Sequence, residues 1–160
     1  MSDSSYTTSF SVDRTPEQVF AAVNDVRSWW MTTVDGDNGA VGDEFSYRVP
    51  GIHFCKMRVT EFVPGEKVVW TVVDNHMTFI SDQSEWKGTE IRFELSGKGG
   101  GTEVRFTHDG LVPTYECFEI CRNAWTFYVG DSLRSLAETG EGKPSDPDTL
   151  SLGEEAARVG

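Results

Sequence analysis

The fold of this chain depends on residues 114–139, which read TYECFEICRNAWTFYVGDSLRSLAET. Thr114 can cap a helix after Pro113, and Gly140 stops it. A helix of this length spans about 39 Å at about 1.5 Å per residue. Its apolar residues recur at helical spacing and predict one buried stripe: Phe118, Cys121, Trp125, Tyr128 or Val129, Leu133 and Leu136. We therefore expect one long helix that packs its apolar side against the rest of the protein.

The chain before this helix is divided into strands by turns. Pro50-Gly51 and Pro64-Gly65 suit turns with glycine at the position of positive φ, and 97–101 is a third break. These stops predict strands at 44–49, 52–63, 66–74, 86–96 and 102–109. Apolar and charged residues alternate within them: Ile91, Phe93 and Leu95, for example, oppose Glu90, Arg92 and Glu94. The alternation predicts an antiparallel sheet with one face toward water, and residues 75–85 fit either a short edge strand or a loop.

The N-terminal part predicts a strand followed by two short helices. Residues 6–12 are rich in aromatic and β-branched types, which favours a strand. Thr15-Pro16-Glu17-Gln18 then has the residues of a helix start, namely a capping hydroxyl, a proline and a Gln three positions later. This helix ends near Asn24, and Val26 to Trp30 form a second one. Residues 31–43 contain Gly and Asp and predict a long loop.

Composition limits the class of protein. The chain has 160 residues, which suits one domain at 1–144 with an acidic, flexible tail at 145–160. Its 14 basic and 26 acidic residues give a net charge of −12, which argues against nucleic-acid binding. No apolar run is long enough for membrane insertion, and the N-terminus lacks a signal-peptide pattern. Three cysteines are too few for a disulfide scaffold, so we expect a cytoplasmic protein.

Several short motifs, taken in order, resemble one family. They are Trp29-Trp30, Val68-Val69-Trp70 after a Pro-Gly turn, Trp86-Lys87-Gly88-Thr89, Phe106-Thr107-His108, and a final helix with Cys117, Trp125, Ser132-Leu133 and Leu136. Together they resemble the SRPBCC superfamily, also called START-like or birch-pollen-allergen-like. Within it they are most similar to the branch named after the activator of the heat-shock-protein-90 ATPase. The resemblance covers residues 6–144.

The resemblance implies an α+β helix-grip fold. In this fold a curved antiparallel sheet of six or seven strands wraps around the long C-terminal helix, with two short helices after the first strand. Members commonly hold a hydrophobic ligand between sheet and helix, and they include lipid carriers, metabolite binders and polyketide cyclases. One helix about 10–12 Å across cannot fill the concave side of six strands spaced by about 4.8 Å. Side chains or a ligand must therefore occupy the remaining space.

The residues expected to line this ligand cavity combine inward strand positions with aromatic helix and loop positions. They are Trp30, Tyr47, Cys55, Met57, Trp70, Phe93, Phe106, His108, Cys121 and Trp125. Each residue type also suits an ordinary core, so the set carries more information than any member. We expect a small apolar or aromatic molecule as the partner.

His108 has two interpretations. It is in phase with Val104 and Phe106, so it faces inward, where it could donate a hydrogen bond to a ligand or act as a general base. Alternatively, it is a buried structural histidine that holds the Asp109-Gly110 turn or the start of the helix. His53 faces either the interior or the rim.

Metal binding is the weaker interpretation of the cysteines. Cys55, Cys117 and Cys121 with His53 lack the short paired spacing of zinc motifs, and buried cysteine behaves as a small hydrophobe. We predict no metal site and no cofactor.

Three functions remain open at this stage. The first is binding of a small hydrophobic or aromatic ligand. The second is a cyclase- or aromatase-like enzyme that uses His108 with Tyr47 or His53, although no carboxylate is expected beside them. The third is an interaction that activates a chaperone ATPase, as the name of the branch implies.

Overall fold

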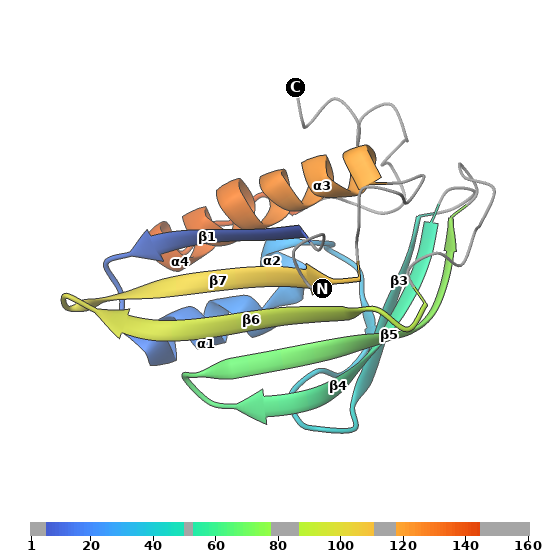
Figure 1. The fold of residues 1–160 in the computed structure, drawn as a ribbon, viewed down its shortest axis with the longest axis horizontal. Coiled ribbons are helices and arrows are strands. Elements are labelled where there is room, and N and C mark those ends of the chain that lie inside the picture. Colours follow the sequence, from blue (N-terminus) through green and yellow to red (C-terminus); the bar gives the residue numbers. More distant parts are fainter. Residues whose placement is uncertain (1–5, 50–52, 78–86, 111–117, 145–160) are drawn as a thin grey trace.

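Seven antiparallel strands form one curved sheet in this computed structural model, which describes residues 6–49, 53–77, 87–110 and 118–144. The strands run β1-β7-β6-β5-β4-β3-β2 across the sheet. Their bounds are β1 Tyr6–Val12, β2 Asp35–Gly36, β3 Glu44–Val49, β4 His53–Val63, β5 Lys67–Met77, β6 Glu90–Lys98 and β7 Gly101–Asp109. Figure 1 shows β3, β4 and β5 bending away from the plane of the other strands. The predicted helix-grip fold is confirmed.

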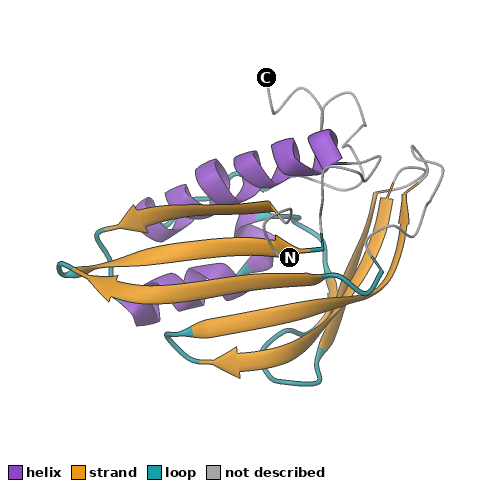
Figure 2. Cartoon of the chain, viewed as in Figure 1, coloured by secondary structure: helices purple, strands orange, loops and turns teal. Residues whose placement is uncertain are grey.

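The helices lie together on one face of this sheet (Figure 2). They are α1 (Pro16–Asn24), α2 (Val26–Trp29), α3 (Phe118–Phe127), a π-helical segment η2 (Tyr128–Leu133) and α4 (Arg134–Thr139). The predicted helix start is present in α1: Thr15 Oγ1 accepts from the Gln18 amide at 3.2 Å, and Gln18 Oε1 accepts from the Thr15 amide at 3.0 Å. The inward residues of the sheet and the helices form one continuous hydrophobic core.

Several predicted boundaries were wrong. The expected loop at 31–43 contains the short strand β2, and β5 continues through 75–77. The strand expected from residue 86 begins at Glu90 instead, because Gly88 has a φ of +88° and forms a turn before it. The predicted helix residues 114–117 and the predicted tail at 145–160 lie outside the described residues.

A bulge in β5 reverses which side chains point inward. Lys56 of β4 pairs with Asp74, whereas the next residue, Met57, pairs with Val72, so Val73 is an extra residue in β5. Val72 is buried, Asp74 is exposed and Asn75 is buried. Without the bulge, strict alternation after Val72 would have turned Asp74 inward and Asn75 outward.

The π-helical segment holds the C-terminal part of the chain against α2. Ser132 Oγ in η2 donates to the Trp29 carbonyl oxygen at 2.7 Å and accepts from the Lys143 amide at 2.7 Å. The segment after α4 therefore passes close to α2. At Gly142 a Cβ atom would lie 2.0 Å from the Ser28 carbonyl oxygen, so only glycine fits without displacement.

Two Gly→Ala substitutions should have opposite effects. Gly142→Ala should lower the free energy of unfolding by about 1–3 kcal/mol, since the segment must move away from Ser28. Gly130→Ala is the matched control. It lies in η2 with no atom near its would-be Cβ and should raise that free energy by about 0.5–1 kcal/mol. Urea denaturation followed by tryptophan fluorescence measures both. Equal effects of the two variants would contradict the close approach at Gly142.

Candidate ligand-binding site between the sheet and the C-terminal helix

Every predicted site residue whose side chain the structure describes is buried. The exposed fraction is at most 4% for Trp30, Tyr47, Cys55, Met57, Trp70, Phe93, Phe106, His108 and Trp125. They come from the residue directly after α2, from β3 to β7 and from α3. The side chain of Cys121 lies outside the described residues.

Five aromatic rings form a closed circuit between sheet and helix. Trp30 lies 6.2 Å from Trp70, measured between ring centroids, and 5.0 Å from Trp125. Trp70 contacts Phe93 at 5.1 Å, Phe93 contacts Phe106 at 5.1 Å, and Phe106 contacts Trp125 at 4.7 Å. These spacings are those of favourable aromatic pairs. In the part of the chain that the structure describes, side chains therefore occupy this portion of the concave face.

Tyr47 extends the aromatic circuit toward the bent part of the sheet. Its ring lies 4.9 Å from Trp30 in an edge-to-face arrangement. Tyr47 pairs in register with Cys55, and Cys55 pairs with Asn75 on the next strand. The three inward residues thus follow one another across β3, β4 and β5.

His108 is held by protein groups on both ring nitrogens. Trp125 Nε1 donates to His108 Nδ1 at 3.1 Å, so the ring carries its hydrogen on Nε2, which donates to Thr89 Oγ1 at 2.8 Å. Burial lowers the pKa of His108 to about 3, and the ring is neutral at physiological pH. These two bonds give His108 a structural role, although they hold neither the Asp109-Gly110 turn nor the start of the helix that the structural alternative had named. The partners in the two bonds are Trp125 of α3 and Thr89, the residue directly before β6.

Asn75 is a polar interior residue that sequence reasoning missed. It is 3% exposed, and neither its Oδ1 nor its Nδ2 has a hydrogen-bond partner; Trp70 Nε1 also lacks one. One signal in the sequence pointed to it. The alternation Val68, Trp70, Val72 places Asp74 inside, and a buried carboxylate without a partner is so costly that the phase had to change before it.

Cys55 behaves as a core residue. Its Sγ lies 3.3 Å from Met57 Sδ, and burial raises the pKa of its thiol well above the usual range, so the thiol stays protonated. Cys117 and the side chain of His53 lie outside the described residues. Among the residues that the structure describes, no three His, Cys, Asp or Glu side chains come together as ligands for an ion.

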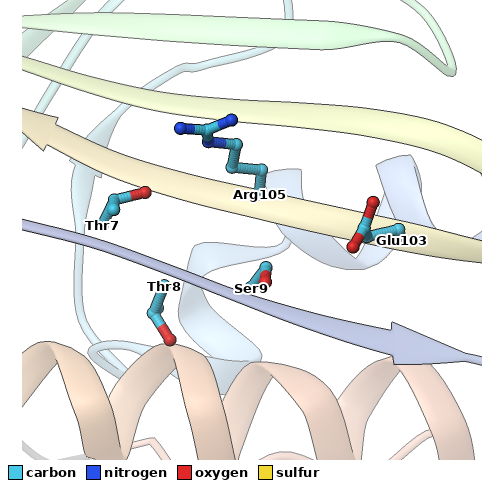
Figure 3. Close-up of a pocket in the computed structure, with 5 residues that line it drawn as sticks. All are labelled: Thr7, Thr8, Ser9, Glu103 and Arg105. Atoms are coloured by element: carbon cyan, nitrogen blue, oxygen red, sulfur yellow. The ribbon is translucent and has the colours of Figure 1, made fainter.

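A separate polar groove lies on the sheet face that the helices do not cover. Its volume is about 340 Å³, and it is lined by Thr7, Thr8 and Ser9 of β1 and by Glu103 and Arg105 of β7. Figure 3 shows Arg105 and Glu103 along β7 and the Thr8 side chain directed toward the helix. The predicted site residues do not contribute to this groove.

Comparison with known families decides the classification. The family model of activator of Hsp90 ATPase homolog 1-like proteins (AHSA1) matches residues 13–138, from the turn before α1 to the last turn of α4. The chain belongs to the AHSA1 family. The predicted SRPBCC resemblance is thereby confirmed.

Solved structures share the fold of this AHSA1 family member. The solution structure of the Aha1 dimer from Colwellia psychrerythraea has 25% identity and a TM-score of 0.70, with 86% of this chain and 98% of that chain covered. MLL2253 from Mesorhizobium loti has 17% identity and a TM-score of 0.66, with 82% and 95% covered.

A third structure is that of DynU16, a protein of the dynemicin biosynthetic locus. It has 17% identity and a TM-score of 0.63, with 88% of this chain and 49% of DynU16 covered. This AHSA1 chain therefore matches about half the length of DynU16. A comparison with curated proteins found no match. No helix in the described part of the chain combines the length and apolar character needed to cross a membrane.

His108 predicts how the stability of this AHSA1 protein depends on pH. The unfolded chain protonates this histidine near pH 6.5, whereas the folded chain does not until about pH 3. Between these values the unfolded state binds more protons, so the free energy of unfolding falls as pH is lowered, by up to about 1.4 kcal/mol per pH unit. His108→Gln should remove this component.

The measurement is the difference in unfolding free energy between wild type and His108→Gln, taken by urea denaturation from pH 7 to pH 4. His76→Gln, at an exposed position on β5, is the control and should retain the wild-type slope. If His108→Gln kept that slope as well, His108 would not be the buried neutral group described here.

Proposed function

We propose that this AHSA1 family member binds a small, largely apolar or aromatic molecule between the sheet and the C-terminal helix. The ligand occupies the end of the interior where Tyr47, Cys55 and Asn75 follow one another across β3, β4 and β5. The family and the helix-grip fold support this function, and so does an interior built from aromatic rings on several separate elements.

One observation carries the proposal: polar atoms inside this aromatic interior have no hydrogen-bond partner. They are Trp70 Nε1, Asn75 Oδ1 and Asn75 Nδ2. Other buried polar groups in the same interior are paired, including Trp29 Nε1 with the Val23 carbonyl at 3.0 Å and the His108 ring. An unpartnered buried polar group costs about 1–3 kcal/mol. A bound molecule offsets that cost where the protein itself does not.

Catalysis by His108 is less well supported. A general base needs a free nitrogen lone pair near the substrate, and the lone pair on Nδ1 accepts the Trp125 indole hydrogen. The ring also has no driving force to take up a proton near neutral pH, because its pKa is about 3. Binding without chemistry is therefore the preferred function.

Ligand binding is tested by titrating the ¹⁵N-labelled chain with three probes: 2-naphthamide, 2-acetonaphthone and decanoic acid. At least one should give saturable chemical-shift changes. The changes should concentrate at Cys55, Asn75 and the Trp70 indole and spare Thr7 and Ser9 at the outer groove. If no probe saturates, or if the shifts map to the outer groove, the proposal is wrong.

Two substitution pairs locate the ligand. Cys55→Leu adds bulk beside Tyr47 and Asn75 and should weaken binding about tenfold or more, while Cys55→Ala should leave it nearly unchanged. Arg105→Ala alters the outer groove and should have no effect. Circular dichroism confirms folding of each variant. Unchanged binding by a folded Cys55→Leu variant, or lost binding by Arg105→Ala, would contradict the interior site. Activation of an Hsp90 ATPase, the function that the family description names, would then become the leading candidate.

A further inference from the structure

The side chain of Asn75 reaches the interior only because of the β5 bulge. Val73 is the extra residue, and the two neighbours of Asn75, Asp74 and His76, are both exposed. Beside Asn75 on β4 lies Cys55. The bulge thus places one carboxamide inside an apolar surface and keeps the adjacent titratable groups in water.

The Asn75 amide receives no hydrogen bond from its neighbours Asp74, His76 and Cys55. The Cys55 thiol lies against Met57 Sδ at 3.3 Å and is a weak hydrogen-bonding group. Asn75 is the described residue with both side-chain polar atoms buried and unpartnered; Asn24, by contrast, donates through Nδ2 to the Phe20 carbonyl at 2.9 Å. A carboxamide has a carbonyl acceptor and N–H donors side by side in one plane. A ligand group that bonds both must therefore carry a donor and an acceptor next to each other.

The charges near Asn75 favour a neutral ligand. The described cations on β4, Lys56 and Arg58, are half-exposed on the opposite face and pair with Glu44. A carboxylate ligand would accept from Nδ2, but it would leave Oδ1 unpartnered and would bury a charge without a counter-ion, which is costly. A carboxamide or lactam satisfies both atoms of Asn75 and carries no charge.

We propose that Asn75 selects ligands that carry a neutral amide or lactam group on an apolar or aromatic body. This inference rests on the proposed function and adds the chemical class of the ligand. Two hydrogen bonds form between the ligand amide and the Asn75 amide in one plane, and the rest of the ligand packs toward Tyr47 and Trp30.

The test compares two probes of nearly the same shape. 2-Naphthamide has a donor and an acceptor on its substituent, whereas 2-acetonaphthone has only the acceptor. Wild-type protein should bind 2-naphthamide about tenfold or more tightly, as expected for one further satisfied hydrogen bond at a buried amide. The Asn75 side-chain NH₂ resonances should shift on binding 2-naphthamide. Isothermal titration calorimetry gives the two affinities.

Asn75→Leu separates selection from mere binding, because it keeps the number of side-chain heavy atoms and the branch at Cγ and removes both polar atoms. The variant should bind the two probes with similar affinity, hold 2-acetonaphthone at least as tightly as wild type does, and melt at a higher temperature. His76→Gln, the neighbouring exposed position, should leave the preference unchanged. A lower melting temperature for Asn75→Leu would show that its amide is structural and would overturn the inference.

The outcomes distinguish the two proposals. If neither naphthalene probe binds wild type, the inference is overturned. If decanoic acid does not bind wild type either, the proposed function is wrong as well. If both naphthalene probes bind wild type with equal affinity, or if Asn75→Leu keeps the preference, ligand binding stands and selection by Asn75 is wrong. If Asn75→Leu does not fold, its amide is structural and the inference is overturned, just as it is by a lower melting temperature. Unchanged Asn75 side-chain resonances with bound 2-naphthamide would also contradict contact with Asn75.

Discussion

The contacts of Trp30 determine how this sheet and its helix fit together. The Trp30 ring, at the end of α2, packs on Tyr47 of β3, Trp70 of β5 and Trp125 of α3. A curved sheet is too wide for one helix to fill, so a third element must reach into the concave side. The two short helices after β1 provide that element. The long helix, the sheet and α2 therefore meet on one indole, and the other rings arrange around it.

The polar groups inside this aromatic interior fall into two kinds. The His108 ring, bound to Trp125 and Thr89, ties α3 to the residue directly before β6 and is neutral because burial lowers its pKa. Asn75 ties nothing together within the described residues. The first kind stabilises the fold, since a satisfied buried polar group fixes the relative position of two elements. The second costs stability, and the ligand that we propose would offset this cost.

Most of the fold could be predicted from residues that lie close together in the sequence. The details of pairing between strands could not be predicted in this way. The helix start at Thr15 and the turn at Pro64-Gly65 depend on residues within one turn of chain, and both were recognised from the sequence. The β5 bulge depends on how β5 pairs with β4, so the change of inward phase after Val72 was not predicted. The inward position of His108 was predicted, but its partners come from elements far away in sequence. Asn75 was missed for the same reason.

The hydrogen bond between Ser132 and Trp29 has a consequence for folding during biosynthesis. Ser132 holds the Trp29 carbonyl across more than a hundred residues, and β1 pairs with β7, so both ends of the chain complete the same structure. Contacts this distant in sequence slow folding, because a long loop must close before they form. On the ribosome, α1 and α2 emerge early, but they cannot reach their final packing until the C-terminal helix has left the exit tunnel. Trp29, Trp30 and Trp70, which are buried in the folded protein, thus stay uncovered until the C-terminal helix has been synthesised and can pack against them.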